Sequence, residues 1–317
     1  MADNGRERSA AAVFRIARLA VAATALLAVG QARAAAAPEL AITFDDLPAH
    51  SLLPQGETRV DIAQHIIAAL QGALITGVYG FVNAVQLERE PASAPVLSLW
   101  RKAGFPLGNH TWSHANLDNV SVDAFETEIA RNEATLRSRA GQTDWHWLRF
   151  PYLAEGTDPA KRAAVRHYLA GHGYRIAAVT MSFGDYAWNE PYARCVAKGD
   201  KAAIAGMERD YLAAAQDQIG RSRAMAKALY GRDIPYVLLM HIGAFDARMA
   251  PRLLDLYRKA GFRFVTLPEA VKDPVYREDA NPALPARPAS LEGRMKARGL
   301  PVPPAAFDLA SLDQLCR

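Results

Sequence analysis

The chain has 317 residues, of which 50% are hydrophobic and 22% are charged, and its formal net charge is +4. This composition excludes a disordered or low-complexity chain, and the length is enough for one large domain or two small ones. Most of the positive charge falls in residues 1–34, so the rest of the chain gives little support to a nucleic-acid partner.

The first 34 residues have the pattern of a secretory signal peptide. Basic side chains from Arg6 to Arg18 precede an uncharged apolar run over residues 19–29, which is too short to cross a bilayer. Ala32, Arg33 and Ala34, with the alanines that follow them, then offer a cleavage site of the small-x-small type. The alternative is an uncleaved anchor or a buried first helix. The pattern predicts a periplasmic or secreted protein with no stable membrane insertion after cleavage.

Residues 38–272 alternate short β-rich runs with amphipathic helical patterns, which predicts βαβ units and a parallel sheet. So many units in this length favour an α/β barrel over an open sheet. Strands are expected over residues 40–44, 78–82, 147–150, 175–181, 236–241 and 262–266, and around Leu107. Helices are expected over residues 60–74, 95–103, 122–140, 159–170, 202–230 and 250–259, with the longest interrupted at Gly206 and Gly220.

Residues 273–317 differ from the rest because they are rich in proline, which has no N–H and breaks regular structure. We expect an extended C-terminal tail packed on the barrel, with a short helical piece before Cys316. Cys195 and Cys316 are the only cysteines, and in an exported protein they are expected to form a disulfide. The alternative is two unpaired thiols.

Nearly every expected strand ends in polar side chains that can carry chemistry. These groups are residues 43–46, 110–114, 149–152 and 185–188, and His241. Because the carboxyl ends of parallel strands meet at one edge of a sheet, the groups are expected to converge there.

His110 and His114 are spaced i, i+4, so on one helical face their imidazoles can share a metal ion. The alternative is two surface histidines that cap a turn. Two imidazoles and one carboxylate bind zinc and leave a position open for water. Asp45 and Asp46 are adjacent, so in a strand their side chains point in opposite directions. One is therefore expected to be a ligand and the other a base.

Together these groups resemble the ordered motifs of the polysaccharide deacetylase family, also called carbohydrate esterase family four, over residues 43–241. The resemblance implies an irregular (β/α) barrel of about seven parallel strands. It also implies a metal-dependent hydrolase that removes acetyl groups from a polysaccharide or oligosaccharide. In that family the residue at Asp45 is the general base, and those at Asp46, His110 and His114 hold the divalent metal.

The resemblance implies further roles in the same site. His241 corresponds to the general acid, Arg149 to the residue that orients the base, and the backbone N–H of Tyr152 to an oxyanion donor. Asp185 is expected to form an ion pair with Arg149. The residues expected to contact substrate are Pro151, Tyr186, Trp188 and Leu239.

Two features near the aspartate pair bear on the substrate. The family has glycine where this chain has Leu47, which predicts added bulk at the rim of the site. His50, on the loop that follows, is a candidate for contact with substrate. Zn²⁺ is the expected metal because it suits two imidazoles and a carboxylate, and Co²⁺, Ni²⁺ or Mn²⁺ are alternatives.

Three function classes follow. The first is the metal-dependent deacetylase, acting on an N-acetylglucosamine polymer, peptidoglycan or acetylated xylan. The second is a metal-free amidohydrolase on the same barrel, which the intact ligand set Asp46, His110 and His114 disfavours. The third is a non-catalytic carbohydrate-binding relic, which the retention of Asp45 and His241 disfavours.

Overall fold

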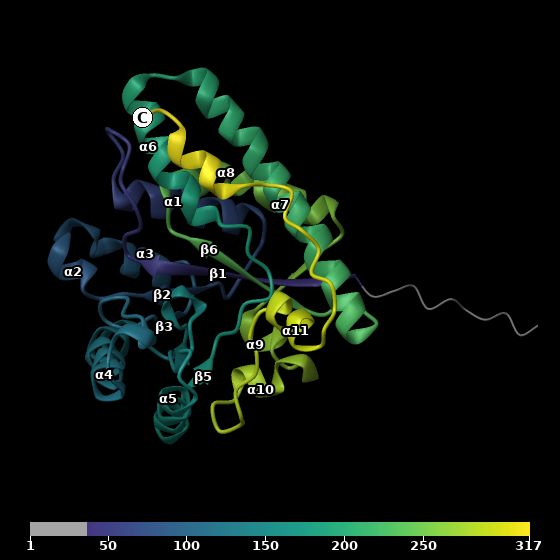
Figure 1. The fold of residues 1–317 in the computed structure, drawn as a ribbon. Coiled ribbons are helices and arrows are strands. Elements are labelled where there is room, and N and C mark those ends of the chain that lie inside the picture. Colours follow the sequence, from purple (N-terminus) through teal and green to yellow (C-terminus); the bar gives the residue numbers. More distant parts are fainter. Residues whose placement is uncertain (1–36) are drawn as a thin grey trace, which may run out of the picture. The chain divides into compact units, whose positions relative to one another are not determined.

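A seven-stranded sheet, with every pair of strands parallel, lies at the centre of the structure (Figure 1). The structure is a computed structural model that describes residues 37–317, so the expected signal peptide over residues 1–34 lies outside it. The strands are β1 (Glu39–Leu47), β2 (Tyr79–Val82), β3 (Leu107–Asn109), β4 (Trp147–Leu148), β5 (Arg175–Ile176), β6 (Tyr236–His241) and β7 (Arg263–Val265).

The strand order is β5-β4-β3-β2-β1-β6, and β7 also pairs with β1. β1 therefore pairs with three strands. It pairs with β6 from Leu40 to Asp45, and β7 pairs with the start of β1 and β2 with the end of β1. This arrangement confirms the predicted irregular α/β barrel, in the form of a half-barrel. β5 is shorter than expected, and only an isolated bridge from Met181 to Leu238 continues the line toward β6.

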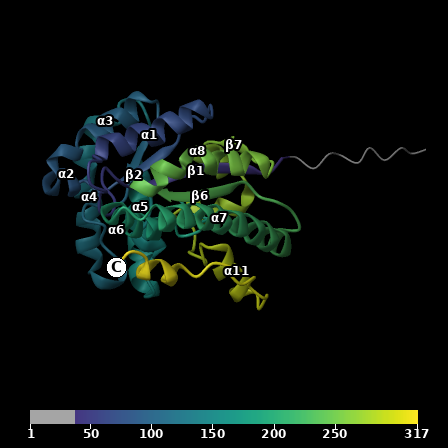
Figure 2. The same ribbon diagram turned by 90° about the horizontal axis from the view of Figure 1, so that it is seen from above.

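The helices lie outside the sheet and pack in pairs, α1 against α3 and α8, α4 against α5, and α6 against α7 (Figure 2). The α-helices are α1 (Arg59–Gly72), α2 (Gln86–Arg89), α3 (Pro95–Lys102), α4 (Val122–Arg139), α5 (Pro159–Gly171), α6 (Asn189–Lys198), α7 (Lys201–Tyr230), α8 (Ala244–Lys259), α9 (Leu267–Ala270), α10 (Arg277–Ala280) and α11 (Leu291–Ala297). The 3-10 helices are η1 (Pro91–Ser93), η2 (Leu117–Asn119), η3 (Pro151–Leu153), η4 (Asp185–Trp188), η5 (Pro274–Tyr276) and η6 (Leu309–Gln314). Among the helices of residues 37–317, none combines the length and the apolarity that crossing a bilayer requires.

Local signals set most of the helix ends. Ser121 caps α4 by accepting a hydrogen bond from the N–H of Ala124, and Thr58 caps α1 within a capping box. The expected interruption of α7 at Gly206 and Gly220 is wrong, because α7 runs unbroken for 30 residues to its left-handed C-cap at Gly231. Packing against α6, α8 and α11 offsets the weak helix propensity of the two glycines.

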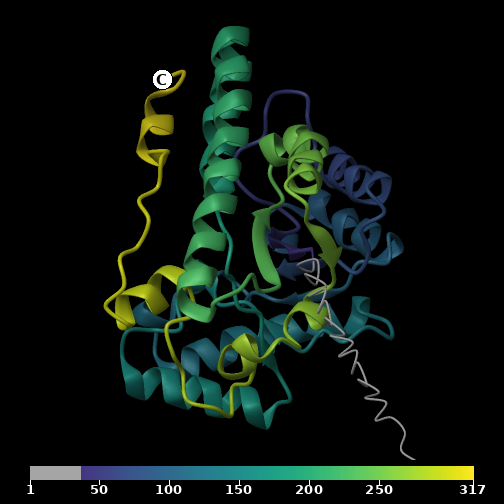
Figure 3. The ribbon, with the colours of Figure 1, turned by 90° about the vertical axis from the view of Figure 1, so that its right-hand side faces the viewer.

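The C-terminal residues run alongside α7, as the views in Figures 1 and 3 both show. The guanidinium of Arg221 in α7 donates to the carbonyl of Pro303 at 3.1 Å. The predicted disulfide between Cys195 of α6 and Cys316 is confirmed, and it closes a loop with a sequence separation of 121. The tail is therefore fixed to the outer helices at both its middle and its end.

Candidate metal centre and active site

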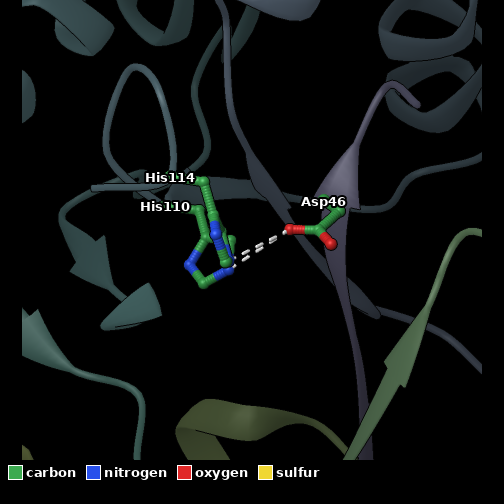
Figure 4. A group of neighbouring side chains, drawn as sticks. All are labelled: Asp46, His110 and His114. Atoms are coloured by element: carbon green, nitrogen blue, oxygen red, sulfur yellow. Dashed lines mark ion pairs between the residues drawn. The ribbon is translucent and has the colours of Figure 1, made fainter. Parts of the chain in front are cut away.

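Three side chains with metal-ligating atoms meet at the carboxyl edge of the sheet. Asp46 lies near the end of β1, and His110 and His114 follow β3. The Oδ1 atom of Asp46 is 3.5 Å from Nε2 of His110 and 3.5 Å from Nε2 of His114 (Figure 4). One ligand atom from each residue lies within 4.8 Å of the others. This is the arrangement that the sequence predicted from the ends of parallel strands.

Residues with a left-handed backbone conformation, and not regular secondary structure, orient these side chains toward one another. Asp46 has φ 64°, Thr111 has φ 63° and His114 has φ 61°, a conformation that non-glycine residues adopt at a cost of about 1–3 kcal/mol each. The expectation that His110 and His114 share a helical face is wrong, because residues 110–116 are irregular, with a bend at residues 112–113. The turn at Thr111 brings the two imidazoles together instead.

The turn at Asp46 also overturns the expectation that the two carboxylates point apart. Nε2 of His110 lies 3.6 Å from Oδ2 of Asp45 and 3.5 Å from Oδ1 of Asp46. The positive φ of Asp46 breaks the alternation of β1, so both carboxylates face the same imidazole. A ligand and a base can therefore stand side by side.

The donor set fits a divalent cation. Nδ1 of His110 donates to the carbonyl of Arg149 at 2.7 Å, which leaves the Nε2 lone pair free, as is usual for a metal ligand. Burial, together with the neighbouring His110, lowers the pKa of His114 to about 4, so this imidazole is neutral at pH 7. Oδ1 of Asp46 is buried and has no hydrogen-bond partner, and a cation would satisfy it.

Asp46 is ionised in this setting. Burial alone would raise its pKa, but the hydrogen bond from His50 and the positive charge of His241 hold it below its ordinary value. The ligand set thus offers one charged carboxylate and two imidazole nitrogens, which suits a divalent cation.

Arg149 and Asp45 form a buried ion pair beside the metal ligands. Nη1 of Arg149 lies 3.0 and 3.2 Å from the two carboxylate oxygens of Asp45. The rest of the guanidinium is held by the carbonyl of Ala177 at 2.6 Å and by the hydroxyl of Thr43 at 3.1 Å. Arg149 therefore fixes the carboxylate of Asp45, in the position that the resemblance implied.

Asp185 pairs with a different residue from the one expected. The predicted ion pair with Arg149 is wrong, because the carboxylate of Asp185 lies 3.2 Å from Nδ1 of His241 and accepts its backbone N–H at 2.6 Å. Although burial alone disfavours a charged imidazole, Asp185, with help from Asp46 and Asp45, raises the pKa of His241 to about 10. His241 is therefore protonated at neutral pH.

The residues expected to contact substrate divide into two groups. Tyr186 is 52% exposed, and its ring lies 5.6 Å from that of His241. Tyr152, which was expected to act only through its backbone N–H, is 66% exposed, and its ring lies 4.5 Å from that of His114. Pro151 and Leu239 are buried. The prediction for Trp188 is wrong, because its ring is fully buried and cannot reach a substrate.

The prediction that Leu47 adds bulk at the rim is also wrong. Its side chain is fully buried and packs against Gly80 of β2, where a Cβ atom would lie 2.5 Å from the Leu47 side chain. Leu47 therefore belongs to the core, and the glycine at position 80 makes room for it.

His50 is placed more centrally than the sequence indicated. Its Nδ1 lies 2.8 Å from Oδ2 of Asp46, and its ring lies 4.8 Å from that of His241. The signal in the sequence was its position four residues after Asp46, but a loop has no periodicity that predicts where such a side chain points.

Comparisons with known proteins agree with this geometry. The family model described as polysaccharide deacetylase matches residues 32–177. No curated protein sequence matches the chain.

Solved structures of this family have the same fold at low sequence identity. The chitin deacetylase of the fungal pathogen Colletotrichum lindemuthianum superposes with a TM-score of 0.50 at 20% identity, covering 74% of this chain and 88% of that one. The Xyl-CE4 domain of a multidomain xylanase from the hindgut metagenome of Trinervitermes trinervoides gives 0.50 at 15% identity, covering 81% and 99%. A mutant CE4 family pseudoenzyme with restored enzymatic activity gives 0.52 at 12% identity, covering 74% and 68%. The matched motifs meet at one edge of a half-barrel of this type, so the chain is similar to the polysaccharide deacetylase family over residues 32–177 and shares the fold of these solved structures.

Proposed function

We propose that the protein is a metal-dependent hydrolase that removes acetyl groups from a polysaccharide or oligosaccharide. The observation that carries this proposal is the cluster of Asp46, His110 and His114, with an unpartnered carboxylate oxygen, beside a buried carboxylate and a protonated histidine. A divalent cation held there, most readily Zn²⁺ and otherwise Co²⁺, Ni²⁺ or Mn²⁺, would polarise an acetyl carbonyl and make water more acidic.

Asp45 is the proposed general base. Its carboxylate lies 3.6 Å from Nε2 of His110, so it stands next to the metal ligands without being needed as one. The ion pair with Arg149 fixes the carboxylate in one orientation. From this position Asp45 accepts the proton of the attacking water.

His241 is the proposed general acid. With its pKa raised to about 10, chiefly by Asp185 against the effect of burial, it carries the proton that the leaving amine or alkoxide requires. Asp185 binds both Nδ1 and the backbone N–H of His241, so it also holds the ring in place. The backbone N–H of Tyr152 is the proposed donor to the oxyanion.

The proposed substrate is an acetylated sugar polymer. Tyr152 and Tyr186 present exposed rings next to His114 and His241, and aromatic faces of this kind stack on sugar rings. An N-acetylglucosamine polymer, peptidoglycan and acetylated xylan all present an acetyl group to this chemistry. The disulfide supports the proposal that the protein acts in the periplasm or outside the cell, where such polymers are found.

A non-catalytic relic is the principal alternative, since one structural neighbour is described as a pseudoenzyme. The retained base Asp45 and acid His241, each in a built ion pair, favour an active enzyme.

An acetate-release screen across the three polymers tests the proposal. Metal-stripped protein is expected to be inactive and to recover on addition of Zn²⁺ or Co²⁺. His114→Ala should lose both the metal and the activity, while His172→Ala, at the exposed end of α5, should keep both. Full activity in metal-stripped protein, or no acetate from any polymer with the loaded protein, would contradict the proposal.

A further inference from the structure

The two carboxylate oxygens of Asp46 face different partners. Oδ1 faces Nε2 of His110 and of His114, each at 3.5 Å, and Oδ2 lies 2.8 Å from Nδ1 of His50. We propose that His50 is a positioning residue that holds Asp46 in its ligating orientation and thereby sets the metal affinity of the site. This inference rests on the proposed metal-dependent function.

The direction of the hydrogen bond follows from the chemistry of its partners. A carboxylate that ligates a metal only accepts hydrogen bonds, so Nδ1 of His50, 2.8 Å from Oδ2, is the donor. The bond uses Oδ2 and leaves Oδ1, which has no hydrogen-bond partner, directed at the imidazoles of His110 and His114. A carboxylate ligand that is free to rotate would lose this division between its two oxygens.

His50 is not itself one of the clustered ligands. The group of metal-ligating atoms within 4.8 Å of one another contains Asp46, His110 and His114, but not His50. The ring of His50 instead fits between Asp46 and the ring of His241, which lies 4.8 Å away at an interplanar angle of 36°. Contacts of this kind around a ligand typically change metal affinity by about 10–100-fold when they are removed.

The loop that carries His50 is built to hold it. Arg59, at the start of α1, donates to the carbonyl of His50 at 2.6 Å and to that of Ser51 at 2.7 Å. The guanidinium is itself held by Glu90, with Nε 3.1 and 3.2 Å from the carboxylate oxygens. At the other end of the turn, the N–H of Ala49 donates to the carbonyl of Asp46 at 3.0 Å. These bonds fix the backbone of the loop, so the ring of His50 is presented to Asp46 in one place.

Zinc affinity of the metal-stripped protein, measured by competition with a chromophoric chelator, tests the inference without any substrate. His50→Phe keeps a ring against His241 but removes the donor, and it should bind Zn²⁺ about 10–100-fold more weakly than the wild type. His50→Asn places an amide N–H near the position of Nδ1 and should recover most of the affinity. His172→Phe, at an exposed position, is the matched control and should leave the affinity unchanged.

A second readout uses Co²⁺ in place of Zn²⁺. The visible absorption spectrum reports the geometry of the ligands, so it should change in His50→Phe and return toward the wild-type spectrum in His50→Asn. Thermal melting of the metal-free proteins shows whether each variant is folded.

The outcomes separate this inference from the proposed function. If the wild type binds Zn²⁺ and folded His50→Phe binds it as tightly, the positioning role is refuted and the metal site stands. If His50→Asn binds Zn²⁺ as weakly as His50→Phe does, the hydrogen bond to Asp46 does not set the affinity and the inference fails. If the wild type binds neither Zn²⁺ nor Co²⁺, the proposed function itself fails.

Discussion

Asp185 and His241 are 56 residues apart in the chain, and the carboxylate of Asp185 accepts the backbone N–H of His241 at 2.6 Å while facing its Nδ1 at 3.2 Å. One carboxylate therefore holds both the main chain and the ring of the proposed general acid. It is also the main influence that raises the pKa of His241 against the effect of burial.

Asp185→Asn is expected to narrow the pH range of activity. A general acid must be protonated, so wild-type activity should persist through neutral pH and fall as the pH rises toward about 10. Without the carboxylate, the alkaline limb of kcat should move to lower pH by about 1–3 pH units. A pH profile of acetate release measures this, and an unchanged alkaline limb would show that Asp185 does not govern the protonation of His241.

The same pKa difference links pH to stability. The pKa of His241 is about 10 in the folded protein against an ordinary 6.5, so its stabilising contribution is complete below pH 6.5 and is lost as the pH rises toward 10. The free energy of unfolding of the wild type, measured in urea at several pH values, should show this decline. The decline in the free energy of unfolding with rising pH should be smaller in Asp185→Asn.

Asp45→Asn and Asp46→Asn should separate the base from the ligand. Asp45→Asn removes the base, so turnover should fall by about 10²–10⁴-fold while zinc stays bound. Asp46→Asn should weaken zinc binding, because it removes the only charged ligand of the cluster. Zinc content after gel filtration and single-turnover rates check this pair, and equal loss of zinc in both variants would contradict the division of roles.

Arg149→Met should destabilise the fold strongly. Arg149 and Asp45 are 1% and 3% exposed at their side chains, so removing the guanidinium leaves a buried carboxylate without its partner, at a cost of about 3–5 kcal/mol. Arg175→Met is the matched control, because its ion pair with Asp144 is exposed and worth at most about 1 kcal/mol. Urea unfolding measures both, and similar losses in the two variants would refute the argument from burial.

Trp188→Ala should lower the stability of the fold, whereas Tyr186→Ala should weaken the binding of substrate. Trp188 is fully buried, with its ring centroid 4.9 Å from that of Phe307 and 6.1 Å from that of Phe245, so truncation should cost about 3–5 kcal/mol of stability. Tyr186 is 52% exposed, so its truncation should change stability by no more than about 0.5 kcal/mol and should raise KM for a polymer. Melting curves and KM values check this, and an unchanged KM in Tyr186→Ala would remove that ring from the substrate site.

Loss of the Cys195–Cys316 disulfide should lower the melting temperature. The bridge closes a loop with a separation of 121 residues, for which the chain-entropy model gives about 4–5 kcal/mol. Reduction of the wild type and the double variant Cys195→Ala/Cys316→Ala should lower the melting temperature to a similar extent, while reductant should not affect the variant. Two titratable thiols in the denatured, unreduced wild type would rule out the bridge.

The sequence by itself determined the alternation of strands and helices and the place where the chemistry gathers. Hydrophobic periodicity identified the strands from β1 to β7, because a buried parallel strand needs a short apolar run. The polar groups that follow those runs had to meet at one edge, because the carboxyl ends of parallel strands lie together. Hence Asp46, His110 and His114 were predicted as neighbours, and the structure brings their ligand atoms within 4.8 Å.

Only the tertiary structure decided how those side chains are aimed and paired. The left-handed turn at Asp46 puts both carboxylates on His110, where strand alternation had predicted opposite directions. Asp185 pairs with His241 and not with Arg149, and His50 contacts Asp46 from a loop. Periodicity reports which face of an element a side chain occupies, but a pairing across the sheet depends on how distant segments pack against one another.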